Sequence, residues 1–110
     1  MPAHFIVRAQ VTDSDKEAFD RWYNDEHLPQ AIAALHPIRA WRGWSEVDPL
    51  IHYAAYEFRE PAELEAVLGS DALKGFIAEF DRVWGTRVSR TREVVFPRQV
   101  HPDQDVEFPN

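Results

Sequence analysis

The residue best suited to do chemistry in this sequence is His27, because an imidazole takes up or releases a proton near neutral pH. It follows Phe19 and Tyr23 at four-residue intervals, which puts the three side chains on one face of a helix. The Tyr23 phenol could orient a substrate oxygen or hydrogen-bond the imidazole. We therefore take His27 and Tyr23 as candidate catalytic residues, with a buried structural histidine and plain aromatic packing as the alternatives.

Aromatic side chains form the second set of candidates, because their flat surfaces can line a cavity for an apolar ligand. We expect two or three of them to line a pocket, and the others to lie in the core or in a subunit interface. The candidate substrate-binding residues are Trp22, Trp41, Tyr53, Tyr56, Phe76, Phe80 and Trp84.

Two arginines late in the chain, Arg90 and Arg92, share one face of an expected strand. If that face is buried, they need acidic partners, for which Glu46, Glu57 and Glu93 are the candidates. If they reach a pocket, they could hold a carboxylate or an enolate. Of the two explanations, pairing with acids is the prediction we favour.

The composition excludes several classes of protein. The 110 residues include no cysteine, which excludes a disulfide scaffold, a thiol nucleophile, a cysteine-ligated zinc site and an iron–sulfur cluster. The net charge of −7 opposes nonspecific binding to nucleic acid. No apolar run approaches the roughly 20 residues of a membrane span, and the first residues lack the apolar core of a signal peptide. We expect a soluble cytoplasmic protein with neither nucleic acid nor membrane as a partner.

The polar residues do not form a recognisable metal or cofactor motif. His4, His27, His36 and His52 are scattered over the chain without a spacing such as H-E-x-x-H. With only four glycines there is no Gly-rich phosphate loop, and no serine sits in a nucleophile elbow. The sequence therefore predicts no bound metal and no cofactor.

The elements that position these residues follow from hydrophobic periodicity and from turn residues. Ser14 and Glu17 fit a capping box at the start of the first helix, and Pro29 is expected to interrupt that helix. Ser70 and Gly85 fit the two ends of the last helix. The expected strands are His4–Val11, Ile38–Val47, Ile51–Arg59 and Arg87–Phe96, and the expected helices are Asp15–Leu28, Gln30–Leu35, Ala62–Leu68 and Asp71–Trp84.

This β-α-β-β-α-β order predicts an α+β, ferredoxin-like fold, a four-stranded antiparallel sheet with two helices on one face. The other sheet face carries aromatics and arginines and must be covered, so we expect a homodimer. The expected domain spans residues 1–97, and residues 98–110 form an extended tail. Val106 and Phe108 in that tail are apolar, and we expect them to pack across the partner subunit.

The run FDRWYNDEHLP, Phe19–Pro29, resembles the first-helix signature of EthD-like proteins, which are small dimeric α/β-barrel proteins related to the ferredoxin-like antibiotic monooxygenases. HYAAYEF at His52–Phe58 and a last strand ending in Phe-Pro fit the same pattern, so the resemblance covers about residues 4–97. It implies the fold and the dimeric barrel. The sequence departs from the pattern at His36–Pro37, where the family commonly has a Pro-Gly turn.

The resemblance implies less about the reaction. Such proteins include cofactor-free monooxygenases, polyketide cyclases, decarboxylases, isomerases and many proteins of degradation pathways. Haem-degrading relatives use a histidine on the second helix, and Asp71–Trp84 has none. We expect a cofactor-free enzyme that uses His27 for acid/base chemistry on an aromatic or polyketide-like metabolite. The alternatives are a dimeric module that binds an apolar metabolite without catalysis, and a purely structural dimer.

Overall fold

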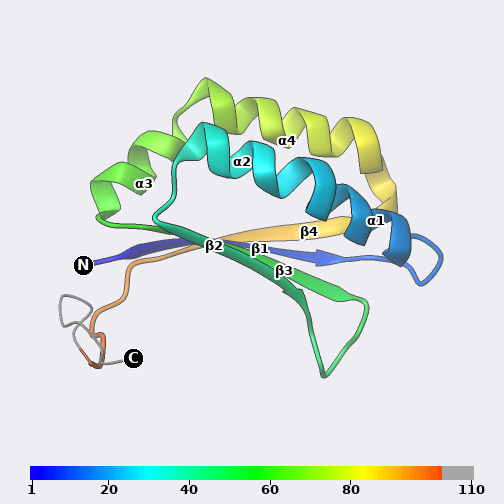
Figure 1. Cartoon of the computed structure of the whole chain (residues 1–110), viewed down its shortest axis with the longest axis horizontal. Coiled ribbons are helices and arrows are strands. Elements are labelled where there is room, and N and C mark those ends of the chain that lie inside the picture. Colours follow the sequence, from blue (N-terminus) through cyan, green and yellow to red (C-terminus); the bar gives the residue numbers. More distant parts are fainter. Residues whose placement is uncertain (103–110) are drawn as a thin grey trace.

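Four antiparallel strands form one sheet, and every helix of the described chain lies on the same face of it (Figure 1). This computed structural model describes residues 1–102. The strands are β1 (Ala3–Gln10), β2 (Arg39–Trp44), β3 (Ile51–Phe58) and β4 (Ser89–Val95), in the spatial order β2-β3-β1-β4. The helices are α1 (Lys16–Trp22), the π-helical η1 (Tyr23–His27), α2 (Leu28–Leu35), α3 (Pro61–Leu68), α4 (Asp71–Trp84) and the 3-10 turn η2 (Gly85–Arg87). The predicted ferredoxin-like α+β fold is confirmed.

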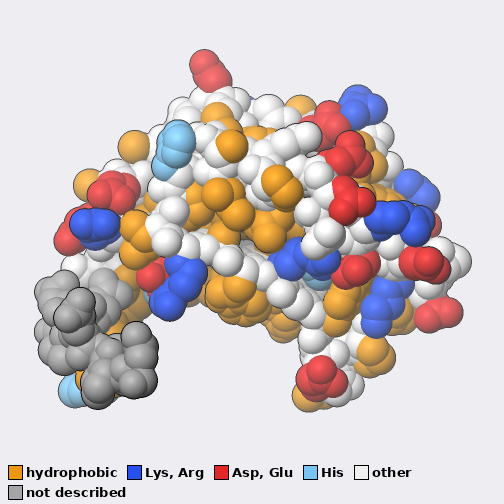
Figure 2. Space-filling model, in the orientation of Figure 1, with side chains coloured by type: hydrophobic (Ala, Val, Ile, Leu, Met, Phe, Trp, Pro, Cys, Tyr) orange, Lys and Arg blue, Asp and Glu red, His pale blue; other side chains and the backbone are white. Residues whose placement is uncertain are grey.

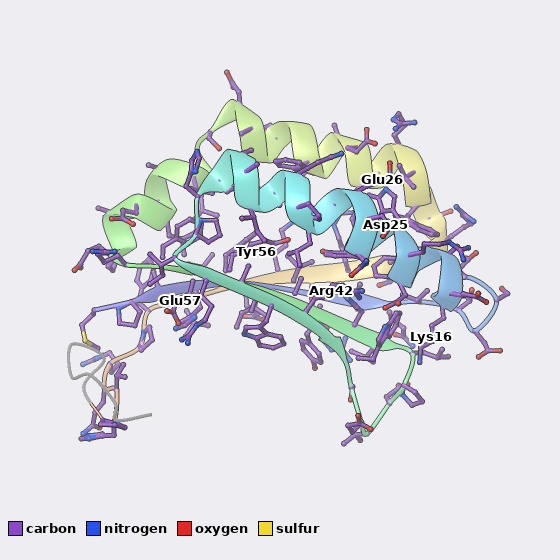
Figure 3. All side chains as sticks on the ribbon, viewed as in Figure 1. Lys16, Asp25, Glu26, Arg42, Tyr56 and Glu57 are labelled. Atoms are coloured by element: carbon purple, nitrogen blue, oxygen red, sulfur yellow. The ribbon has the colours of Figure 1, made fainter. Side chains whose placement is uncertain are left out.

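The sheet register decides which side chains meet the helices. β1 lies at the centre and pairs with β3, Phe5 opposite Tyr56, and with β4, Val7 opposite Arg92. Because side chains alternate along a strand, one set points toward the helices and the other away from them. Phe5, Val7 and Tyr56 are buried under the helices. Figure 3 shows Tyr56 on the helix side of the sheet and Glu57 on the opposite side.

Pro29 does not interrupt the first helical stretch, contrary to the prediction. Leu28 keeps helical dihedrals, φ −65° and ψ −47°, and its N–H donates to the carbonyl oxygen of Tyr23, five residues back. This wider π-helical turn shifts the hydrogen-bond register just before the proline. Pro29 then lies in the first turn of α2, where its missing N–H is tolerated. As a result, Tyr23 and His27 form the two ends of the π turn.

The capping box predicted from Ser14 and Glu17 is wrong. A turn over Asp13–Asp15 comes first, so the helix begins at Lys16, and no side chain of the described residues caps its N-terminus. Ser14 Oγ instead lies 3.2 Å from Thr12 Oγ1. Ser14 therefore stabilises the turn rather than the helix.

The ends of the later elements agree more closely with the prediction. Ser70 Oγ accepts a hydrogen bond of 3.2 Å from the Leu73 N–H, and Gly85 ends α4 at φ 54°, where glycine is favoured. The η2 turn occupies the expected start of the last strand, so β4 begins only at Ser89. His36 adopts a left-handed φ of 53° and ends α2.

The sheet face away from the helices carries exposed apolar side chains. Figure 2 shows hydrophobic side chains gathering beneath the sheet, where the molecule is hollowed. Trp41 is 54% exposed and Val95 is 41% exposed. The prediction that Val106 and Phe108 pack against a partner falls outside the described residues. Within residues 1–102, no helix is both long enough and apolar enough to cross a membrane.

Candidate active site

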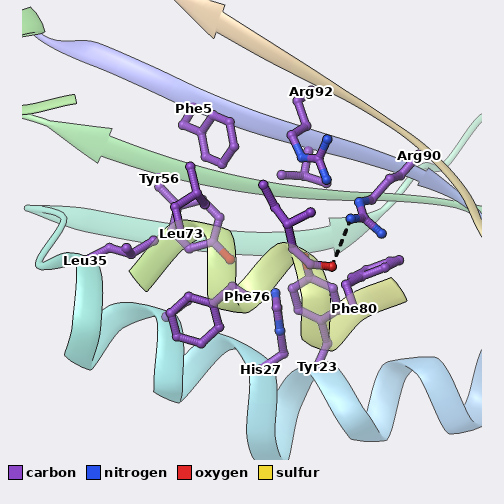
Figure 4. A pocket seen from close by; sticks show the side chains of 13 residues that line it. Phe5, Tyr23, His27, Leu35, Tyr56, Leu73, Phe76, Phe80, Arg90 and Arg92 are labelled. Carbon is purple, nitrogen blue, oxygen red and sulfur yellow. Dashed lines mark hydrogen bonds between the residues drawn. The ribbon is translucent and has the colours of Figure 1, made fainter. Parts of the chain in front are cut away.

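A pocket opens between the helix-facing side of the sheet and the helices η1, α2 and α4 (Figure 4). Its cavity volume is about 40 Å³, well below the roughly 300–1,000 Å³ of established small-molecule sites, so its walls lie close together. Most of the wall is apolar, and the few polar groups converge from both sides. The lining residues are Phe5, Val7, Tyr23, His27, Ala31, Leu35, Tyr56, Leu73, Phe76, Ile77, Phe80, Arg90 and Arg92.

His27 points from the end of η1 into this pocket (Figure 4). Its ring stacks on Trp22 with 4.5 Å between ring centroids and meets Tyr23 edge-on at 4.8 Å. The residue is 8% exposed. Its Nδ1 atom is buried and has no hydrogen-bond partner among residues 1–102. A buried nitrogen without a partner is destabilising, so this imidazole is not explained as a hydrogen-bonded core histidine.

The surroundings of His27 keep the imidazole neutral. Burial is the largest cause, and it lowers the pKa of His27 to about 4. The positive charge of Arg90 lowers this pKa further, and the negative charge of Glu79 opposes the shift. At pH 7 the side chain is thus in the form that can accept a proton.

Two phenols, Tyr23 and Tyr56, line the same pocket. Tyr23 is 1% exposed and Tyr56 is 3% exposed. Burial raises the pKa of Tyr23 well above its usual value and raises the pKa of Tyr56 to about 12. Both hydroxyls therefore keep their protons at neutral pH. An interaction with Tyr56 raises the pKa of Tyr23 further and lowers that of Tyr56, as expected if the Tyr23 hydroxyl donates to Tyr56 and leaves the Tyr56 proton for a ligand.

The predicted site residues fall into three groups. His27, Tyr23, Tyr56, Phe76 and Phe80 come together around the pocket. Trp22 stands behind His27 as its stacking partner, and Trp84 is buried in the core 5.2 Å from the ring of Phe19. Trp41 and Tyr53 lie on the opposite face of the sheet, because their positions alternate with Arg42 and Tyr56, which face the helices.

Part of the pocket wall was not predicted from the sequence, and the acidic partners predicted for Arg90 and Arg92 are wrong. Phe5, Val7, Leu35 and Leu73 line the pocket as ordinary apolar residues, and the sequence has no signal that separates them from the rest of the core. Arg90 and Arg92 reach the same pocket from β4. Arg90 pairs with Asp81 of α4, Nη1 to Oδ1 3.0 Å, rather than with Glu46, Glu57 or Glu93. The pairing arises because this face of β4 lies against α4.

A network of polar side chains lies next to Tyr23, one of the residues that line the pocket. Asp20 Oδ1 accepts hydrogen bonds from Arg42 Nη1 and from Trp44 Nε1, each 2.8 Å long. Arg42 Nη1 also lies 3.3 Å from His52 Nε2, and the His52 ring is 4.6 Å from the ring of Tyr23. These contacts connect α1, β2 and β3 and fix the position of Tyr23.

Replacing Asp20 with alanine is expected to lower the free energy of unfolding by about 1–2 kcal/mol, because Arg42 loses its carboxylate while its side chain stays 15% exposed. The same change at Asp25, an exposed residue of η1, serves as the control and is expected to change stability by less than about 0.5 kcal/mol. Urea unfolding at pH 7 measures both. Equal losses in the two variants would contradict the role of the network.

The described residues contain no group of three His, Asp or Glu side chains placed to hold a metal ion. The polar chemistry of the pocket consists of one imidazole, two phenols and two guanidinium groups.

No protein-family model matches the sequence, and no curated protein is similar enough in sequence to count as a relative. Solved structures are similar in fold. An ethyl tert-butyl ether D (EthD) family protein from Bacillus halodurans superposes with a TM-score of 0.66 at 15% identity, over 84% of this chain and 97% of that one. This chain has the EthD-type ferredoxin-like fold.

Two further structures share this fold. SnoaB, a cofactor-independent oxygenase from Streptomyces nogalater, gives a TM-score of 0.64 at 12% identity, over 93% of this chain and 98% of that one. A NIPSNAP family protein from Agrobacterium tumefaciens gives a TM-score of 0.63 at 8% identity, over 93% and 98% of the two chains. At these identities the similarity shows the fold alone.

Proposed function

We propose that this protein is a cofactor-free enzyme that moves protons on an aromatic or polyketide-like small molecule, with His27 as general base and acid. The observation that carries the proposal is a buried, neutral imidazole, without a hydrogen-bond partner on Nδ1 within residues 1–102, facing an apolar pocket. A structural histidine would be expected to have such a partner. The fold shared with SnoaB, a cofactor-independent oxygenase, supports this class of chemistry.

The reaction begins with the transfer of a proton from an acidic C–H or phenol of the substrate to the His27 imidazole. The electron pair left behind moves to a substrate oxygen, where Tyr56, with Tyr23 beside it, donates a hydrogen bond. The imidazolium then returns the proton to another carbon of the substrate, which completes an isomerisation. If the carbanion first attacks a carbonyl carbon of the same molecule, the imidazolium instead protonates the resulting alkoxide, which completes a cyclisation. A carbanion formed in this way can also add molecular oxygen, which acts as the oxidant, to give a peroxide that the imidazolium protonates. Because an imidazole with a pKa of about 4 is a weak base, the substrate must already be activated.

Deuterium exchange tests this proposal without knowledge of the natural substrate. Wild type and His27→Gln are incubated in deuterium oxide with a panel of enolisable ring compounds, and NMR follows the loss of the acidic C–H signal. We expect wild type to accelerate exchange for at least one compound, and His27→Gln to lose roughly 10²–10⁴-fold of that rate. Trp41→Phe, on the other sheet face, is the control and keeps the wild-type rate.

Two outcomes would reject the catalytic role. His27→Gln could exchange as fast as wild type, or the compounds could bind without any acceleration. The second outcome would identify a binding module instead. Convergence of the two phenols on the pocket that contains His27 favours catalysis, because an oxygen that gains negative charge needs donors of this kind.

We infer that a second copy of the chain covers the bare sheet face. Trp41 at 54% exposure, Val95 at 41% exposure and the half-buried Ile6 and Tyr53 present there an apolar surface that water would otherwise cover. Trp41→Glu is expected to shift the protein toward monomer in sedimentation velocity. Ile32→Glu, on α2, is the control and leaves the oligomeric state unchanged. A wild-type monomer at high concentration would overturn the inference.

A further inference from the structure

We propose that the pocket takes an organic anion, and that Arg92, with Arg90 beside it, binds the carboxylate or enolate oxygen of a small ring acid. This inference rests on the proposed function, whose substrate class it narrows from apolar metabolites to acids with an apolar body. Figure 4 shows both arginines reaching into the pocket from the sheet, on the wall that faces His27.

Arg90 is held in place by contacts on several sides. Its side chain is 10% exposed, Nη1 lies 3.0 Å from Asp81 Oδ1, and Nη2 donates to the carbonyl oxygen of Ile77 at 3.5 Å. The guanidinium carbon lies 3.8 Å from the centroid of the Phe80 ring. Arg90 is thus a fixed positive charge in the pocket wall, already partly neutralised by Asp81.

Arg92 lies two residues further along β4 on the same face, and it differs from Arg90 in having no acidic partner among residues 1–102. Within residues 1–102, no carboxylate oxygen lies within 4 Å of its guanidinium nitrogens. Burial is the largest cause that lowers the pKa of Arg90, and the positive charge of Arg92 lowers it further, so the two cations repel each other. An anion bound between them would relieve this repulsion and would meet a guanidinium with free N–H donors.

The remaining wall fits the apolar part of such an acid. Phe5 of β1, Leu35 of α2 and Leu73 of α4 supply apolar wall, and the narrow cavity of about 40 Å³ favours a single flat ring over a larger body. A ligand whose oxygens meet Arg92 extends its ring across the pocket toward His27. Because Arg90 lowers the pKa of His27, partial neutralisation of the arginines by the ligand also makes His27 a stronger base.

The test compares ligands that differ only in charge. Benzoate, phenylacetate and 2-naphthoate, and the amide of each, are titrated into the full-length protein, and two-dimensional NMR gives the dissociation constants. We expect at least one acid to bind about tenfold more tightly than its amide. Arg92→Gln is expected to lose about tenfold of the affinity for that acid, and Arg92→Lys less. Arg59→Gln, an exposed site in the turn after β3, is the matched control and keeps wild-type affinity.

The proposal is overturned if none of the three acids binds, if each amide binds as well as its acid, or if Arg92→Gln binds like wild type. Because Arg92 is exposed, its replacement should leave the fold intact, which the NMR spectrum of the variant verifies directly. His27→Gln separates the two proposals. Acid binding that survives in His27→Gln supports the anion site even if deuterium exchange shows no catalysis.

Discussion

Lowering the pH from 7 to 5 is expected to reduce the free energy of unfolding by about 3 kcal/mol. His27 and His52 cause this loss, because burial lowers the pKa of each to about 4. In His52 the Arg42 charge acts in the same direction as burial. The negative charge of Asp20 raises the pKa of His52, and His27 lowers it. For His27, Arg90 lowers the pKa and Glu79 raises it.

The sign follows from proton binding in the two states. In the unfolded chain each histidine binds a proton near its ordinary pKa of 6.5, whereas in the folded chain it does so only near pH 4. Between these values the unfolded state binds more protons, so stability is full above about pH 6.5 and is lost as the pH falls toward 4. Each histidine contributes roughly half of the expected loss in the free energy of unfolding.

Urea unfolding at pH 7, 6 and 5, at equal protomer concentration, measures this pH dependence. His27→Phe removes one of the two groups and is expected to remove about half of the loss. A free energy of unfolding that stays constant between pH 7 and 5 would show that the two imidazoles are not buried in their neutral form. An unchanged slope in His27→Phe would show that His27 is not one of the groups involved.

Phe19→Ala is the substitution with the largest expected effect on stability, a loss of about 3–5 kcal/mol. Phe19 is 0% exposed and lies at the centre of an aromatic cluster in which its ring is 5.1 Å from His52 and 5.2 Å from both Tyr23 and Trp84. The cluster also includes Trp22, Trp44 and Phe80. Removing the ring leaves a cavity that these rigid neighbours cannot close.

The same cluster positions Tyr23, so the loss in Phe19→Ala should be accompanied by weaker ligand binding in the pocket. Urea unfolding compares this variant with Ile32→Ala, where the side chain is 42% exposed and the expected change is below about 1 kcal/mol. Similar losses in the two variants would contradict a central role for Phe19.

The fold could be predicted because several local signals agree. Alternating residues in Ile51–Phe58, the cap at Ser70 and the glycine at the end of α4 all lie where the structure has them. The π turn could not be predicted, because the dihedral angles before Pro29 are imposed by the packing of Phe19 and Tyr23 against the sheet. Local preference at a proline is weaker than the burial of two aromatic rings.

The candidate site was predictable only in part. Helical spacing places His27 and Tyr23 together, because both lie on one element. Alternation along a strand separates Tyr53 from Tyr56 but does not show which of them faces the helices, so aromatics from both faces entered the prediction. The Arg90–Asp81 pair depends on how α4 crosses β4, and a crossing geometry of this kind has no local sequence signal.

We propose that His27 is present for its imidazole nitrogens and not for its packing. The direct test is the free energy of unfolding of His27→Phe against wild type, at pH 7 and equal protomer concentration. Phenylalanine keeps the stacking on Trp22 and removes the buried Nδ1 that lacks a partner within residues 1–102. We predict equal stability or a gain of up to about 2 kcal/mol. A loss of about 2 kcal/mol or more would mark His27 as a structural residue and contradict the claim.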